Sequence, residues 1–198
     1  MNDCGLNFDE IYRTYRVRIL HYLSRLVGEA ESEDLTQETF VKVSQKLDGF
    51  RRESQLVTWL YKIATNTAVD KLRSPSFRER VANHDSDESI EDAESNGEIK
   101  PLKEHLVELR VIKEEMNSCV RNVIDQLPKP YKTVIVLSNI EGFKDSEIGP
   151  ILGLSSSATK IRLHRARAQL KQKLADQCVL YRNDENELSC DRKGIDVI

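Results

Sequence analysis

The sequence predicts an all-α protein made of two small helical domains joined by an acidic, flexible linker. Residues 8–73 and 102–174 repeat apolar side chains every three or four positions, which is the spacing of amphipathic helices. From Asn83 to Glu98 there are seven acidic residues and no Lys or Arg, a composition typical of a solvated linker. The total of 198 residues suits one or two small domains.

The first domain is expected to contain three helices. The first has an apolar stripe from Phe8 to Leu26 and ends near Gly28. The second ends at Asp48-Gly49, and the third is predicted from Gln55 to Arg73, before Ser74-Pro75. The predicted buried face of the second helix is Thr36, Thr39, Phe40, Val43 and Leu47, and its polar face is Asp34, Gln37, Glu38 and Val41.

The third helix carries an unusual mixture of side chains on one face. If Leu60, Ile63, Ala64 and Thr67 are buried, the stripe left over is Trp59, Lys62, Asn66, Asp70 and Arg73. The basic loop Phe50-Arg51-Arg52 precedes this helix. An aromatic ring beside cations and an amide suits unstacked bases of single-stranded nucleic acid. The residues alone equally allow Trp59 to belong to the core, because Trp is usually well buried.

The second domain ends in a predicted helix-turn-helix. A helix is expected from Leu102 to Leu127, and Pro128 and Pro130 then interrupt it. Residues 131–140 are rich in β-branched side chains, but no partner strand is apparent, so a helix closed by Gly142 is expected. Helices over 145–152 and 156–174, separated by Gly153-Leu154-Ser155, complete the motif.

The last of these helices has a packing face and a basic face. The packing face is Thr159, Leu163, Ala166 and Leu170, which leaves Ser157, Lys160, Ile161, His164 and Arg165 pointing outward. Such side chains suit base edges in the DNA major groove, and Arg167 would neutralise backbone phosphate. From Lys144 to Lys173 there are seven basic residues against two acidic ones. A basic helix that merely ends a bundle is the alternative at this point.

Several function classes are excluded or disfavoured. There is no Gly-rich phosphate loop, no Gly-x-Ser-x-Gly elbow and no His-Glu-x-x-His pair, and the four histidines are scattered. We therefore expect no catalysis and no cofactor. No apolar run approaches about 20 residues and no signal peptide opens the chain, so we expect no membrane insertion. We expect a cytoplasmic location with reduced cysteines.

Two groups of motifs resemble one protein family. Asp34-Leu-Thr-Gln-Glu-Thr-Phe40 and Thr58-Trp-Leu-Tyr-Lys-Ile-Ala-Thr-Asn66 resemble the sigma-2 domain of extracytoplasmic-function sigma factors of the sigma-70 class. Leu127-Pro128, Glu147-Ile148, Leu152-Gly-Leu-Ser155 and Lys160-Ile-Arg-Leu-His-Arg-Ala-Arg167 resemble the matching sigma-4 helix-turn-helix domain. Both sets occur in the right order with a linker between them, which makes the pair far more specific than either set alone.

The resemblance implies a bacterial factor that binds core RNA polymerase, selects promoter DNA and melts it. It also implies that an anti-sigma factor controls this factor. It implies polymerase contacts by Asp34, Gln37, Glu38 and Val41. It implies recognition and melting of the −10 element by Arg51, Arg52, Trp59, Lys62, Asn66, Asp70 and Arg73. It implies −35 recognition by Ser157, Lys160, Ile161, His164, Arg165 and Arg167. The domains are then 1–74 (sigma-2), 75–104 (linker), 105–175 (sigma-4) and 176–198 (tail).

Two features depart from the family pattern. Gly149-Pro150 falls inside the first helix of the helix-turn-helix, where an interior proline costs about 3 kcal/mol. We therefore expect this helix to start near Gly149 or to be irregular. The polar tail, expected to be partly disordered or dependent on a partner, carries Cys178 and Cys190 and resembles the tails of some metal-responsive members. These two cysteines are the candidate metal or redox residues, although close pairs typical of zinc sites are missing.

A different function class stays open on the sequence. A helix-turn-helix regulator would bind duplex DNA without core polymerase and would use its N-terminal helices for dimerisation or ligand binding. Such a regulator does not need the Trp59–Arg73 stripe, whereas a factor that melts DNA needs it. An RNA-binding module is a weaker alternative, because neither an aromatic-bearing β-sheet nor a KH loop is apparent.

Overall fold

The computed structural model describes residues 7–51, 54–75, 77, 120–182 and 188–192. Several predictions concern residues outside this set: the candidate site residue Arg52, the acidic run from Asn83 to Glu98, residues 102–119 of the fourth predicted helix, and Cys4 and Cys119.

The N-terminal unit is a bundle of three helices, as predicted. They are α1 (Phe8–Val27), α2 (Glu29–Lys46) and α3 (Leu56–Arg73), with a short 3₁₀ turn at Leu47–Gly49 after α2. The Asn7 side chain caps α1 by accepting a hydrogen bond from the Asp9 amide at 2.8 Å. Apolar side chains from all three helices meet in the core, where Tyr22 and Thr65 share a hydrogen bond of 2.7 Å.

The C-terminal unit begins with helical residues 120–125 and continues into α6 (Lys129–Ile135). The β-rich stretch after Tyr131 is helical, as predicted. It finishes as a wide π turn over Val136–Ile140, in which the Glu141 amide donates to the Val136 carbonyl at 2.9 Å. Gly142 follows with a φ of +77°, a conformation that favours glycine.

The helix-turn-helix consists of α7 (Asp145–Leu152) and α8 (Ser156–Gln177). Gly153 ends α7 in the left-handed region with a φ of +65°, and the Ser155 hydroxyl caps α8 by accepting from the Ala158 amide at 3.2 Å. The expectation that α7 starts near Gly149 is wrong, since α7 begins at Asp145. Pro150 thus lies inside α7, on its exposed side and two residues before its end.

The tail forms an antiparallel hairpin that the sequence did not reveal. Strand β1 (Cys178–Arg182) pairs with β2 (Leu188–Arg192). Ten residues of the tail, which was expected to be partly disordered or dependent on a partner, thus form regular structure. Cys178, at the start of β1, is buried. The fold class is all-α with this hairpin added.

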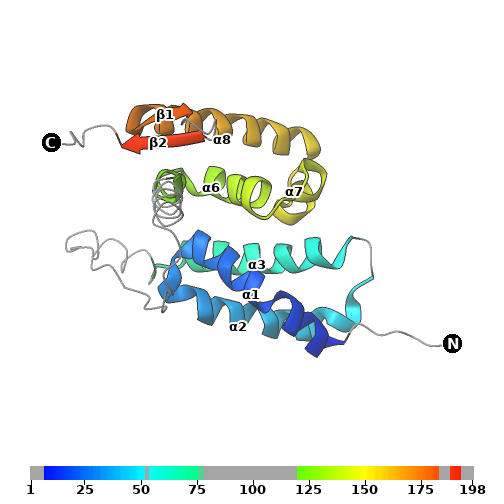
Figure 1. Cartoon of the computed structure of the whole chain (residues 1–198). Coiled ribbons are helices and arrows are strands. Elements are labelled where there is room, and N and C mark those ends of the chain that lie inside the picture. Colours follow the sequence, from blue (N-terminus) through cyan, green and yellow to red (C-terminus); the bar gives the residue numbers. More distant parts are fainter. Residues whose placement is uncertain (1–6, 52–53, 76, 78–119, 183–187, 193–198) are drawn as a thin grey trace, which may run out of the picture.

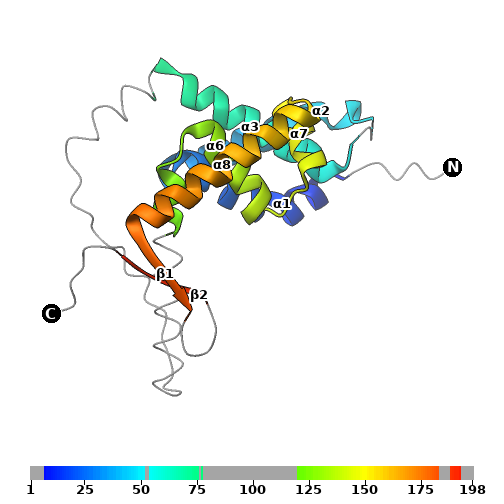
Figure 2. The same ribbon diagram turned by 90° about the horizontal axis from the view of Figure 1, so that it is seen from above.

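The two helical units are packed against each other (Figures 1 and 2). In Figure 1, α6 and α7 lie next to α3, and α8 lies on their far side. The closest packing between the units is that of α3 against α7. Figure 2 shows the hairpin projecting away from the helices at the end of α8. The surface of α3 that faces the C-terminal unit thus forms part of the interface between the two units.

Candidate nucleic-acid interface

The predicted stripe on α3, defined as Trp59, Lys62, Asn66, Asp70 and Arg73, exists as one face of that helix. Its four polar members are exposed, while the opposite face is buried in the bundle core. Trp59 is half-buried, and its ring centroid lies 4.8 Å from that of Phe50 in the preceding loop. Trp59 is therefore neither a core residue nor fully free: one part of the indole rests on Phe50 and the rest is accessible.

Trp59 borders a hollow of about 450 Å³ that both units line. The N-terminal unit contributes Phe50, Arg51, Thr58 and Lys62 alongside Trp59, and α7 contributes Pro150. The proline that interrupts the usual pattern of α7 thus lies beside the only tryptophan of the chain. Aromatic and cationic groups around an open hollow match the chemistry that holds an unstacked base.

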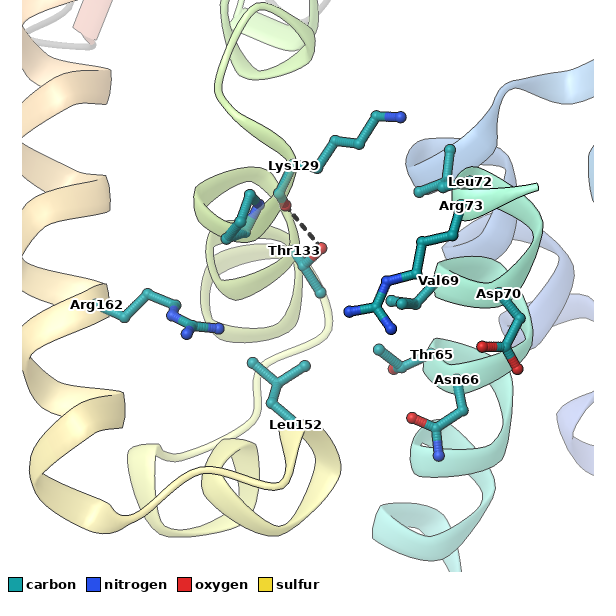
Figure 3. Close-up of a pocket in the computed structure, with 11 residues that line it drawn as sticks. Thr65, Asn66, Val69, Asp70, Leu72, Arg73, Lys129, Thr133, Leu152 and Arg162 are labelled. Carbon is teal, nitrogen blue, oxygen red and sulfur yellow. Dashed lines mark hydrogen bonds between the residues drawn. The ribbon is translucent and has the colours of Figure 1, made fainter. Parts of the chain in front are cut away.

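The rest of the α3 stripe faces a second hollow, which we call the interdomain crevice (Figure 3). It measures about 420 Å³, and its polar lining includes Asn66, Asp70 and Arg73 from α3, Lys129 and Thr133 from α6, and Arg162 from α8. Arg73 and Arg162 point toward α6 from opposite sides, and Lys129 extends toward α3. The Asp70 carboxylate points away from Arg162. Positively charged side chains of both units thus line the same crevice.

The outward face of α8 carries the predicted second surface. Ser157, Lys160, Ile161, His164 and Arg165 are all exposed, and Ile161 is 53 % exposed although it is apolar. On the opposite face Thr159, Leu163 and Ala166 are buried and Leu170 is half-buried, as predicted. Arg167 is exposed and donates a hydrogen bond to the Ser138 hydroxyl at 3.0 Å. An exposed face that combines cations with one apolar group is suited to base edges and phosphates.

The predicted polymerase-binding face lies on α2. Asp34, Gln37, Glu38 and Val41 are all exposed, and Val41 is 54 % exposed. Glu38 forms an ion pair of 2.7 Å with Lys42 one turn further on. The apolar face of the same helix, including Leu35, Phe40 and Val43, is buried. A helix with one face fixed in the core presents the other face rigidly to a partner.

One residue that joins the two units was missed by the sequence analysis. The Glu141 carboxylate, after the π turn, accepts from the Tyr61 hydroxyl at 2.5 Å and from Arg25 at 3.3 Å. Burial, with a further contribution from the hydrogen bond to Glu141, raises the pKa of Tyr61 far above its usual value. No local pattern signals this contact, because its partners lie 80 and 116 positions away in the chain.

The candidate cysteines lie in the hairpin, on different rungs of the ladder. Cys178 is opposite Arg192, whereas Cys190 is opposite Leu180. Among the described residues, no three His, Cys, Asp or Glu side chains gather as a metal site would require. None of the described helices combines the length and apolar character needed to cross a membrane.

Comparisons with known proteins identify the class. The family model for Sigma-70 region 2 matches residues 11–78, and that for Sigma-70 region 4 matches residues 117–170. The "ECF RNA polymerase sigma factor SigW" of Bacillus subtilis is 31 % identical over 172 residues, covering 85 % of this chain and 89 % of that protein. The "RNA polymerase sigma-H factor" of Pseudomonas aeruginosa is 32 % identical over 169 residues, covering 84 % and 86 %.

Solved structures agree on the fold. The sigma factor RpoE, in complex with the anti-sigma factor NepR from Bartonella quintana, superposes with a TM-score of 0.60 at 21 % identity, covering 85 % of this chain and 96 % of that one. CnrH, in complex with the cytosolic domain of CnrY, gives a TM-score of 0.56 at 23 % identity, covering 85 % and 88 %. The class is thus that of sigma-70-type transcription initiation factors. Within that class, the chain belongs to the ECF family of RNA polymerase sigma factors.

Proposed function

We propose that the α3 stripe and the Phe50–Arg51 loop recognise and melt the −10 element of the promoter. The observation that carries this is the accessible indole of Trp59 on Phe50, next to the exposed Lys62, Asn66 and Arg73. A captured base stacks on the aromatic ring, and the amide and cations bind its edge and the neighbouring phosphates. Stacking offsets the cost of unpairing, so melting needs no catalytic residue and no cofactor. Arg52 belongs to this set by its place in the sequence.

The exposed face of α8 is proposed to read the −35 element as duplex DNA. Lys160 and Arg165 are suited to guanine O6 and N7, and Ile161 to a thymine methyl group. Ser157 and His164 complete this face, and Arg167 binds backbone phosphate. The 53 % exposure of the apolar Ile161 among cations favours direct reading of bases.

The exposed face of α2, made of Asp34, Gln37, Glu38 and Val41, is proposed to bind core RNA polymerase.

The proposed domains are 1–74, 75–104, 105–175 and 176–198, with the acidic segment as tether and the cysteine-containing tail as an accessory. The polymerase supplies the catalysis, so the chain itself is not an enzyme and works in the cytoplasm. An anti-sigma factor is the proposed regulator, in keeping with the complexes of RpoE and CnrH.

Run-off transcription with core polymerase on a promoter library tests the proposal. Trp59→Ala should lower transcript yield at least about fivefold, because one stacked base contributes about 1–3 kcal/mol. The double variant Lys160→Ala/Arg165→Ala should relax selection at the upstream element while leaving transcription from a pre-opened template intact. Glu10→Gln is a matched surface control, since Glu10 is exposed in the first turn of α1, away from all three faces.

The outcomes separate the two function classes. Transcripts that require the protein and are lost with Trp59→Ala support melting by the α3 stripe. If the protein binds duplex DNA but no transcript depends on it, the helix-turn-helix regulator replaces the sigma factor as the proposed function. If Trp59→Ala transcribes as well as the unmodified chain, the assignment of the −10 surface is wrong.

A further inference from the structure

We infer that the interdomain crevice is a binding site for a small nucleotide, a compound that joins two or more phosphate groups to an aromatic base. Lys129 and Arg162, two of the cations that line the crevice, belong to neither of the proposed DNA-binding faces. The proposed function therefore leaves these two charges without a ligand.

Three cations from three helices line the crevice. Arg73 comes from α3, Lys129 from α6 and Arg162 from α8. Asp70 is the only acidic residue among the described residues of the lining, and its carboxylate points away from Arg162 (Figure 3). None of the three cations forms an ion pair within the described part of the chain. Like charges gathered in this way repel one another, so a bound anion would relieve the repulsion.

The three cations are placed to act on one ligand. The Arg73 and Arg162 side chains point toward α6 from opposite sides, and Lys129 extends toward α3 (Figure 3). The Lys129 ammonium group lies 6.0 Å from the centre of the Phe77 ring, directly beyond the end of α3. A guanidinium group binds two phosphate oxygens at once, and an ammonium group adds a point charge. Three such groups suit a ligand with two or more negative charges, such as a diphosphate.

The crevice also has an apolar wall, which a phosphate group alone would not use. Val69 and Leu72 line it from α3, and Leu152 lines it from the end of α7. Asn66 adds an amide that can both donate and accept hydrogen bonds. The volume of about 420 Å³ is typical of small-molecule sites, which measure about 300–1,000 Å³. Cations beside an apolar wall and an amide match the phosphates, the ring and the polar edge of a nucleotide.

Promoter DNA is the other source of phosphate groups. The proposed function assigns the N-terminal unit to the −10 element and α8 to the −35 element. Because these elements are separate, one stretch of DNA backbone is not expected to need cations of both units side by side. This step rests on the proposed function and favours a small ligand, and the experiment below includes DNA as an outcome.

Isothermal titration calorimetry of the full chain tests the inference. The probes are adenosine diphosphate, guanosine diphosphate, pyrophosphate and adenosine, at about 0.1 M NaCl, where the Debye length is about 10 Å, and without divalent cations. One molecule of either nucleotide should bind per chain. Pyrophosphate should bind several-fold more weakly because it lacks the base, and adenosine should bind more weakly still because it lacks the charge.

Variants of the crevice locate the site. Lys129→Gln and Arg162→Gln should each lower the affinity for adenosine diphosphate about fivefold or more, because each removes a charge-assisted hydrogen bond to phosphate. Lys171→Gln makes the same charge change on an exposed position of α8 outside the crevice and should leave the affinity unchanged. Circular dichroism checks that the variants are folded, and Lys129 is exposed, so its replacement leaves the core intact.

The outcomes separate the possible ligands. Binding of one nucleotide per chain that both crevice variants weaken and Lys171→Gln does not supports the inference. The absence of binding overturns it, as does an equal loss in all three variants, which would indicate a general attraction to basic surface. Pyrophosphate binding as tightly as the nucleotides overturns the nucleotide class. If Lys129→Gln and Arg162→Gln weaken a gel shift of promoter DNA but not nucleotide binding, the crevice serves DNA and the inference is wrong. The titration contains neither polymerase nor promoter, so a failure of the proposed function in run-off transcription leaves its result unaffected.

Discussion

At the scale of single residues, Gly149 shows how tightly the helix-turn-helix is built. It is buried where α7 meets the start of α8. A Cβ atom placed there would lie 3.1 Å from the Leu154 carbonyl oxygen and 3.2 Å from the Thr159 hydroxyl. The backbone carbonyl is fixed by the turn, so the structure must shift to admit even one methyl group.

Gly149→Ala should therefore lower the free energy of unfolding by about 1–3 kcal/mol, the usual cost of overpacking. Urea unfolding followed by circular dichroism measures this. Gly49→Ala is the matched control, because a Cβ at Gly49 meets nothing within 4 Å. Equal stability of the two variants would contradict the close approach of α7 and α8.

The two buried tyrosines predict alkaline sensitivity. Burial raises the pKa of Tyr22, and burial together with the Glu141 hydrogen bond raises that of Tyr61. An unfolded tyrosine ionises near pH 10, so the folded state binds more protons above that pH. Their contribution to stability is present below about pH 10 and is lost as pH rises beyond it.

Absorbance at 295 nm during an alkaline titration checks this. Of the six tyrosines, two should ionise only as the fold is lost, and Tyr22→Phe should reduce the late group to one. Ionisation of Tyr22 and Tyr61 near pH 10, with the helical signal intact, would contradict the burial of these hydroxyls.

At the scale of elements, the sequence predicted the helices well because their signals are local. Apolar spacing located α1, α2 and α3, and Ser155 and Gly153 marked the turn before α8. The hairpin was missed because β1, with the sequence Cys-Val-Leu-Tyr-Arg, does not alternate apolar and polar side chains. For the candidate site residues on α3 and α8, helical periodicity predicted which side chains are exposed. Glu141 could not be found this way, since its partners come from distant positions.

The cap of α8 offers a test at this scale. Ser155→Ala removes the hydroxyl that accepts from the Ala158 amide and should destabilise the protein by about 1 kcal/mol. Because α8 carries the proposed −35 surface, the affinity for duplex promoter DNA should fall as well. Ser156→Ala, one position further on and exposed, should change neither. Thermal unfolding and a gel shift measure the two effects, and equal behaviour of both variants would count against the cap.

At the scale of the whole molecule, the packing of the two units against each other, here called closure, adds one attractive and one repulsive group of charges to the apolar contacts between them. The Glu141 carboxylate draws the C-terminal unit onto Arg25 and Tyr61. The interdomain crevice sets Arg162 opposite Arg73 and beside Lys129. Both groups take side chains from both units, so neither acts unless the domains meet.

Removing a repulsive charge should therefore close the chain further. Arg162→Gln should stabilise the closed form by about 0.2–1 kcal/mol, the range for partly exposed charge pairs. Salt screens such repulsion, with a Debye length of about 3 Å at 1 M, so the gain should disappear at 1 M NaCl. Lys171→Gln makes the same charge change on an exposed position of α8 outside the crevice and should have no effect on closure. Scattering at low and high salt distinguishes the variants: a chain that opens on Arg162→Gln would show that this guanidinium joins the domains instead of separating them.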